Sequence, residues 1–287
     1  MKKLICLLLA LVLCVVCVVS SLAAQEKLGA VGNLTKLGIE EGALNKILAG
    51  ASFKDTPYTG LKYYDTLNSM TAALNSGEVA AITLDEYTYK YLLSRTGKVV
   101  SIKTPEESQN HVIEGSYVML LRDDDKELCS RISEAIAGMK SDGTLDALKV
   151  KYIDECIAGA DPEPVSPDVF DGAETIRVAL TGDRPPMDYF NAAGQPAGFN
   201  TALVSEIAKR MKVNVLFISI DSGARAVSLA SKRADVVFWS ELNNFDNWEH
   251  SHTEDQPENT VITEAYAKCR IVDVVLQTSP LAPKSEE

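Results

Sequence analysis

The sequence contains the same construction twice. Residues 62–86 read KYYDTLNSMTAALNSGEVAAITLDE, and residues 217–241 read FISIDSGARAVSLASKRADVVFWSE. In each copy a β-rich run ends in aspartate, an amphipathic stretch and a short turn follow, and a second β-rich run ends in acidic or Ser-Glu residues. Two similar α/β units predict two lobes whose strand ends line one cleft, a typical place to bind a ligand.

The chain begins with the pattern of an export signal. Two lysines precede an apolar run at residues 4–19, and small residues follow at 21–23. We therefore expect residues 1–24 to be a cleaved signal peptide and the protein to be periplasmic or at the cell surface. A single-pass anchor is one alternative, and a lipid on Cys14 or Cys17 is another.

Charge and cysteine content narrow the partners and the crosslinks. The net charge of −12 disfavours nucleic acid and anionic lipid as partners. Three cysteines follow the signal, so they cannot all pair within one chain: Cys129, Cys156 and Cys269. Cys129 and Cys156 flank an expected helical hairpin and could form a disulfide, which export permits but does not require.

Strands alternate with helices through most of the chain, which predicts an α/β fold with mainly parallel sheets. A segment with three spaced prolines, residues 158–174, is the only obvious linker. The expected strands are residues 27–31, 61–64, 79–84, 99–102, 115–121, 176–180, 213–220, 236–239 and 271–276. The expected helices are residues 39–48, 66–76, 87–94, 126–140, 144–157, 200–211 and one that begins near 222.

Residues 176–241 resemble the first lobe of a family 3 solute-binding protein, the extracytoplasmic amino-acid-binding component of ABC importers. The shared motifs are a strand followed by Gly-Asp-x-Pro-Pro, Gly-Phe before a helix, then Glu-Ile-Ala-Lys-Arg and Ala-Asp-Val-Val. Residues 262–277 resemble the segment that leaves that lobe, residues 115–153 the closing segment, and residues 67–93 the second lobe. The resemblance implies the two-lobed type 2 periplasmic-binding fold.

The order of these segments differs from that of the family, in which the first lobe precedes the second lobe and the closing helices. We interpret the chain as one circularly permuted binding protein, although an inactive fusion of two fragments is an alternative. The expected parts are a signal peptide at 1–24, the smaller second lobe at 25–112, a crossover strand and closing helices at 113–157, the linker at 158–174, the first lobe at 175–277 and a tail at 278–287.

In the second lobe the resemblance assigns a carboxylate and a loop to the ligand. Asp85 matches the carboxylate that holds the ligand's α-ammonium group, and an N-cap of the following helix is its alternative role. Asn33, Leu34 and Thr35 match a Ser-Gly-Thr loop that binds the ligand's carboxylate. An ordinary helix N-cap in this turn is equally compatible with the sequence.

The first lobe departs further from the family. Arg184 stands where the family has an aromatic clamp, Thr181 where it has an acid, and Ser222 where it has a second aromatic residue. The family's Thr-x-x-Arg, which grips the α-carboxylate, has no clear counterpart here. Arg184 and Arg225 could supply that charge, because a guanidinium group donates two parallel hydrogen bonds to a carboxylate. Solvated surface arginines are the alternative.

The internal repeat predicts that Ser240 faces Asp85 from the opposite wall, with Trp239 and Glu241 beside it. Trp239 could stack on a ligand or fill the core. His250 and His252 lie in a polar stretch without recognisable metal-ligand spacing, so we expect neither a metal nor a cofactor.

These observations favour a monomeric solute-binding protein that captures an amino acid or small carboxylate by hinge closure and passes it to an ABC permease. No common catalytic signature is present, so we do not expect an enzyme. Two alternatives stay open: an exported dehydratase-like enzyme on the same fold, with Glu241 as acid or base, and a sensory ligand-binding module.

Overall fold

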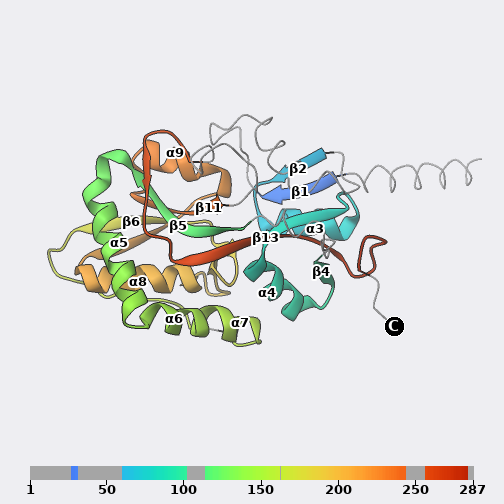
Figure 1. Ribbon diagram of the computed structural model, residues 1–287, viewed down its shortest axis with the longest axis horizontal. Coiled ribbons are helices and arrows are strands. Elements are labelled where there is room, and N and C mark those ends of the chain that lie inside the picture. Colours follow the sequence, from blue (N-terminus) through green and yellow to red (C-terminus); the bar gives the residue numbers. More distant parts are fainter. Residues whose placement is uncertain (1–26, 32–59, 102–113, 162, 244–255, 284–287) are drawn as a thin grey trace, which may run out of the picture.

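The computed structural model describes residues 27–31, 60–101, 114–161, 163–243 and 256–283. Within them the chain forms two lobes, a larger and a smaller one (Figure 1). The expected helix at 39–48 and the expected signal peptide lie outside the described residues. No described helix is long and apolar enough to cross a membrane.

The smaller lobe is built from three parallel strands in the order β2-β1-β3. Thr66 caps α3 by accepting a hydrogen bond from the Ser69 amide, and Gly77 ends that helix in the left-handed conformation. The elements of this lobe are β1 (Lys27–Val31), β2 (Gly60–Tyr64), α3 (Leu67–Ser76), β3 (Ala81–Asp85), α4 (Glu86–Thr96) and β4 (Val99–Ser101).

The larger lobe repeats this arrangement with the parallel order β10-β6-β11. Helices α5 and α8 cover its sheet, and a small three-stranded sheet, β7-β8-β9, follows β6. Its strands are β5 (Glu114–Arg122), β6 (Thr175–Leu180), β7 (Asp183–Arg184), β8 (Asp188–Phe190), β9 (Pro196–Ala197), β10 (Asn214–Ser219), β11 (Val236–Asn243) and β12 (Thr260–Ile262). Its helices are α5 (Lys126–Ser141), α6 (Thr144–Lys149), α7 (Glu155–Ile157), α8 (Phe199–Met211) and α9 (Arg225–Ala230), with 3-10 turns at Asp123–Asp125 and Ser222–Ala224.

Two long strands join the lobes. Strand β5 comes directly after the smaller lobe in sequence and pairs antiparallel with β11 of the larger lobe. Strand β13 (Ala267–Leu276) follows the larger lobe; its residues 267–270 pair with β5, and its residues 271–274 pair with β3. The two sheets are therefore continuous through β5 and β13, as Figure 1 shows.

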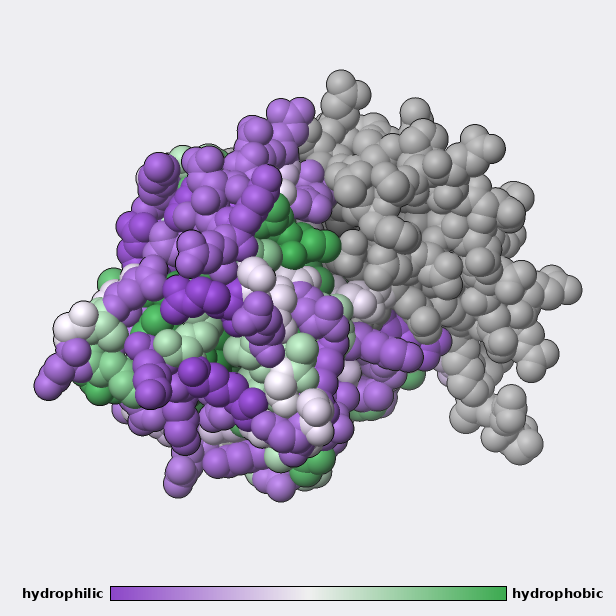
Figure 2. Space-filling view, turned by 60° about the vertical axis from the view of Figure 1, so that its left-hand side comes forward, coloured by the Kyte–Doolittle hydropathy of each residue, from purple (hydrophilic) through white to green (hydrophobic). Residues whose placement is uncertain are grey.

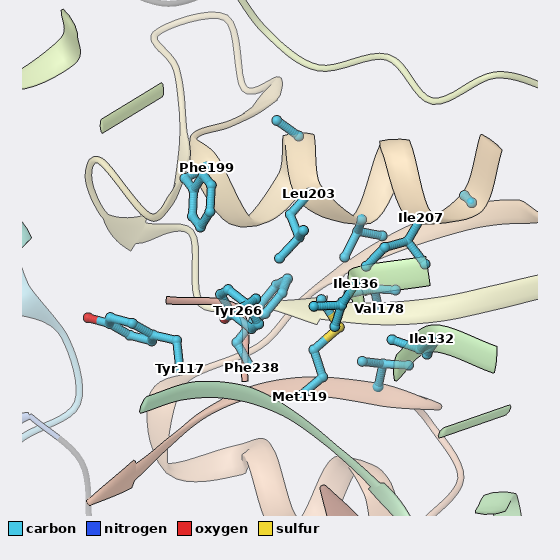
Figure 3. Close-up of a cluster of buried hydrophobic side chains, with 14 of the residues drawn as sticks. Tyr117, Met119, Ile132, Ile136, Val178, Phe199, Leu203, Ile207, Phe238 and Tyr266 are labelled. Atoms are coloured by element: carbon cyan, nitrogen blue, oxygen red, sulfur yellow. The ribbon is translucent and has the colours of Figure 1, made fainter. Parts of the chain in front are cut away.

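Each lobe has its own apolar core. In the larger lobe α5 buries Ile132, Ile136 and Met139 on the face that their helical spacing predicts. Figure 3 shows Ile132 and Ile136 within this core. In the smaller lobe Met70 and Ile82 belong to a separate cluster. On the face of the molecule that Figure 2 shows, hydrophilic residues predominate among the coloured residues, with apolar residues between them.

The structure confirms the α/β class and the repeated units, and it corrects several details. The expected helix at 144–157 is divided by a π-helical segment, Val150–Asp154. Strands β11 and β13 are longer than predicted because each pairs with β5, which sequence periodicity does not reveal. Cys129 and Cys156 are both buried and free, so the possible disulfide between them is not formed.

Candidate ligand-binding site

Two loops of the larger lobe extend toward the smaller lobe from the ends of neighbouring strands. The last residues of β6 and β10, Leu180 and Ser219, are register partners in a parallel pair. The Ile220 amide extends this pairing by donating to the Leu180 carbonyl over 2.9 Å. The loops that begin at Thr181 and Asp221 therefore emerge side by side at the carboxyl edge of the sheet, the edge at which α/β proteins bind ligands.

A buried aspartate organises the first of these loops. Asp188 Oδ2 accepts hydrogen bonds from the Thr181 amide at 3.0 Å, the Thr181 hydroxyl at 2.9 Å and the Gly182 amide at 3.2 Å. Gly182 has a φ of +74°, and any side chain there would run into the Phe190 ring. Asp188 Oδ1 accepts from Asn200 Nδ2 over 3.2 Å. These hydrogen bonds fix the conformation of the turn that carries Asp183 and Arg184.

Asp183 and Arg184, the two residues of β7, both contact the smaller lobe at the beginning of a helix. Asp183 Oδ2 accepts a hydrogen bond from the Leu67 amide at the start of α3, over 2.8 Å. An Arg184 guanidinium nitrogen lies 3.4 Å from Oδ2 of Asp85, which precedes α4. Because a helix N-terminus carries partial positive charge, the Asp183 contact is electrostatically favourable.

Asp85 is the N-cap of α4 and is only 2% exposed. Its Oδ1 accepts from the Thr88 amide over 2.9 Å, and its Oδ2 accepts from the Thr88 hydroxyl over 2.7 Å. The capping role considered from the sequence is therefore present. A role in holding a ligand's ammonium group stays a prediction.

Arg184 is the counter-ion of Asp85. Burial alone would lower the pKa of Arg184, but the charges of Asp85, Tyr117 and the two neighbouring aspartates raise that pKa above its ordinary value. The guanidinium group is therefore positively charged at all physiological pH values.

Arg225 lies in the second loop, half-buried, and forms no ion pair with any residue that the structure describes. Burial and then the positive charge of Arg184 lower the pKa of Arg225 to about 10, against the opposing effect of Asp188 and Asp183. It remains charged at neutral pH, beside Arg184, without a matching carboxylate contact.

Ser222 begins the same loop and is 1% exposed. Its hydroxyl oxygen is buried and has no hydrogen-bond partner among the described residues. Ser222 and Arg225 are three residues apart across a 3-10 turn, in which side chains at that spacing project to the same side. A second buried oxygen without a partner in the described part of the chain is Asp183 Oδ1.

A row of aromatic rings runs across the junction of the lobes. Tyr87 of α4 stacks on Tyr117 of β5 with ring centroids 6.3 Å apart, and Tyr117 stacks on Tyr266 at 6.1 Å. The Tyr266 hydroxyl donates to Asn200 Oδ1 over 3.2 Å. Figure 3 shows that the Tyr117 hydroxyl points away from the larger-lobe core, whereas Tyr266 lies within it.

Of the other sequence-based candidates, three lie in β11 and two lie outside the described part. Trp239 is 8% exposed and packs in an apolar cluster of the larger lobe, so its environment is that of a core residue. Ser240 pairs with Tyr117 in the extended β11, and Glu241 follows in the same strand. Asn33 and Thr35 lie outside the described residues.

The structure thus brings Asp85, Thr181, Arg184, Ser222 and Arg225 to the junction of the lobes, and we name these residues, with Asp183 and Asp188, the interlobe cluster. Sequence reasoning assigned no role to the two additional aspartates or to the three tyrosines. Asp183 belongs to the Gly-Asp-x-Pro-Pro turn that was recognised in the sequence. Its place in a turn was therefore predictable, but its contact with Leu67 was not.

Among the described residues, no group of three or more His, Cys, Asp or Glu side chains is placed to hold a metal ion. His250 and His252 lie outside this part of the chain. The interlobe cluster instead offers two guanidinium groups, a hydroxyl group and a carboxylate oxygen, which suit an anionic organic molecule with a hydrogen-bond donor.

Comparison with known families finds one match, in the larger lobe. Residues 176–243 match the bacterial extracellular solute-binding proteins, family 3. None of the curated proteins matches the chain.

Three solved structures show distant likeness. A ligand-binding component of an ABC-type import system from Staphylococcus aureus, with zinc bound, is 10% identical; the match covers 87% of this chain and 65% of that chain, with a TM-score of 0.40. The periplasmic VFT2 domain of BvgS from Bordetella pertussis is 12% identical, with coverage of 90% and 83% and a TM-score of 0.39. The reduced OxyR regulatory domain from Pseudomonas aeruginosa is 11% identical, with coverage of 91% and 92% and a TM-score of 0.39.

This chain spans less than two thirds of the length of the Staphylococcus aureus protein. Because all three likenesses are distant, the assignment depends on the motifs of the larger lobe. Residues 176–243 of the larger lobe are therefore similar to the bacterial extracellular solute-binding proteins of family 3, and the match covers about a quarter of the chain.

Proposed function

We propose that this protein is an exported, non-catalytic solute-binding protein. It captures a small polar or acidic solute between its lobes, closes on it and delivers it to the permease of an ABC importer. The observation that carries this proposal is the placement of charged side chains from both lobes at the junction, Asp85 from one and Arg184 from the other.

The strands that join the lobes supply a hinge in this proposal. Strands β5 and β13 pair over residues 114–117 and 267–270, between the two cores. A solute that contacts both lobes favours the closed arrangement by the difference in its affinity for the closed and open states. Bending near this paired segment would separate the lobes without disturbing either core.

We also propose that the chain is one permuted binding protein with the part boundaries expected from the sequence. The linker supports this proposal because hydrogen bonds attach it to the larger lobe before the chain enters β6. The Val165 amide donates to the Pro196 carbonyl over 3.0 Å, and the Asn214 side chain bonds to the backbone of Phe170 in both directions, at 2.8 and 3.0 Å. A linker held in this way can connect the closing helices to β6, the first strand of the expected first lobe.

The test is a thermal-shift screen of the chain without residues 1–24 against amino acids, carboxylates and short peptides. A compound present at about 100 times its Kd should stabilise the protein by about 2.7 kcal/mol, because it binds only the folded state. Small-angle scattering with and without the compound should show a smaller radius of gyration when it is bound.

Three results distinguish the candidate functions. Stabilisation without consumption of the compound supports solute binding. Conversion of the compound into a product would identify an exported enzyme instead. Failure of every compound class to stabilise the protein would contradict the proposal.

A further inference from the structure

The interlobe cluster also indicates which class of solute it accepts, and this inference rests on the proposed function. We propose that the solute is a small hydroxy acid. Its carboxylate is held by the Arg184 and Arg225 guanidinium groups with the Ser222 hydroxyl, and its own hydroxyl donates to Asp183 Oδ1.

The first step is that Asp85 is not available to an ammonium group. Three donors already serve its carboxylate, namely the Thr88 amide, the Thr88 hydroxyl and the Arg184 guanidinium group. Its 2% exposure leaves little room for another donor. In this arrangement of the lobes, a solute with an ammonium group would have to displace the Arg184 guanidinium group from Asp85.

The second step is that the positive charges of Arg225 and Arg184 are incompletely matched by carboxylates of the described residues. Arg225 forms no ion pair within the described part of the chain. Arg184 reaches Asp85 through one nitrogen at 3.4 Å, a long contact for an ion pair. Because the two loops leave register-paired strand ends, both guanidinium groups lie at the same edge of the sheet. A carboxylate between them would neutralise charge that is otherwise unmatched.

The third step concerns two buried oxygens of the interlobe cluster, Ser222 Oγ and Asp183 Oδ1, which have no hydrogen-bond partner among the described residues. Ser222 Oγ can donate to a carboxylate oxygen, and Asp183 Oδ1 can only accept. Leaving either group buried and unpaired costs about 1–3 kcal/mol, which a correctly shaped solute would recover. Asp183 Oδ1 is beside two positive charges, so a neutral hydroxyl donor is better placed there than an ammonium group.

Matched sets of small acids test this assignment. L-malate, L-aspartate and succinate differ only in carrying a hydroxyl, an ammonium or a hydrogen at one carbon, and L-lactate, L-alanine and propionate repeat the comparison with a single carboxylate. Isothermal titration calorimetry should show the hydroxy acid of at least one set binding at least tenfold more tightly than its amino acid. The plain acid should lie between them.

Substitutions in the interlobe cluster test whether its arginines cause the preference for the hydroxy acid over the amino acid. Arg225→Gln should weaken binding of the preferred hydroxy acid at least tenfold, and Arg225→Lys should recover part of it because the charge is retained. Arg184→Gln should reduce the preference for the hydroxy acid over the amino acid, because Asp85 then lacks its internal cation. Arg131→Gln is the matched control, since Arg131 pairs with Glu174 at the surface and should leave binding unchanged.

The outcomes separate this inference from the function on which it rests. An amino acid that binds more tightly than its matched hydroxy acid would overturn the hydroxy-acid assignment and leave the solute-binding function standing. Unchanged binding in Arg225→Gln would overturn the placement of the carboxylate. If no small solute of any class binds, both proposals fail.

Discussion

Two groups of arginine and aspartate lie at opposite edges of the larger lobe's sheet, and they are built differently. At the amino ends of the strands, Asp235 bonds to the Arg177 amide, to Arg177 Nε and a terminal nitrogen at 2.6–2.9 Å, and to Arg122 at 2.9 Å. At the carboxyl ends, Arg184 makes one contact of 3.4 Å across the lobes. The first group satisfies its charges within one lobe, whereas the second leaves donors available.

We infer that the first group stabilises the fold, whereas the second group has the unmatched charge that the proposed binding function requires. Arg122 and Asp235 are 13% and 14% exposed at their side chains, and Arg122 also donates to the Ala234 and Leu229 carbonyls. A buried charge with a complete set of partners gains nothing from a solute. A half-buried guanidinium group without a carboxylate contact, such as that of Arg225, does gain from one.

The largest effect is expected from Asp235→Ala. This change leaves Arg122 and Arg177 without their shared carboxylate, and removing one partner of a buried ion pair costs about 3 kcal/mol or more. Urea unfolding at pH 7 measures the loss of stability. A cost below about 1 kcal/mol would show that this group is not a stabilising network. Binding of the preferred solute should be unaffected at temperatures where the variant is folded.

A smaller, graded effect is expected from acid. Burial opposes ionisation of Asp235, but hydrogen bonds from Arg177 and Arg122 hold its pKa below the ordinary value. Its contribution to stability is therefore fully present above the unfolded-state pKa, near 3.9, and is lost as the pH falls through the lower folded-state pKa. The stability difference between wild type and Asp235→Asn, from urea unfolding at pH 7, 5, 4 and 3, should shrink only below about pH 4. A difference that already shrinks between pH 7 and 5 would contradict this sign.

Small effects on stability are expected from Arg184→Gln in the absence of solute and from its control, Arg131→Gln. The Arg184 contact with Asp85 is long, and the Thr88 donors remain, so the expected cost is about 1 kcal/mol. Arg131→Gln, which breaks a more exposed pair, should cost less than about 0.5 kcal/mol. If Arg184→Gln destabilises the protein as much as Asp235→Ala does, the two groups do not differ in the way proposed here.

Much of the candidate site was predictable because its parts are local. The strand that ends at Asp85 and the helix that follows it are encoded by periodicity and by a capping aspartate, so both the strand end and the N-cap were expected. Arg184 was singled out because it stands where the recognised pattern has an aromatic residue, and Arg225 because it could supply the positive charge that the missing Thr-x-x-Arg provides in that pattern. The Gly182 turn is likewise a local requirement for a left-handed backbone.

What the sequence by itself determined is therefore most of the longer elements, their repeated order and the similarity of residues 176–243 to a known family, but not the short strands β7, β8, β9 and β12. Only the tertiary structure decided which of those elements meet. The Leu67–Asp183 and Asp85–Arg184 contacts join residues 116 and 99 positions apart, and they exist because β5 and β13 cross between the lobes. Local periodicity encodes a strand but not its neighbour. The same limit explains why β11 continues past Trp239, since its last residues are held by pairing with β5.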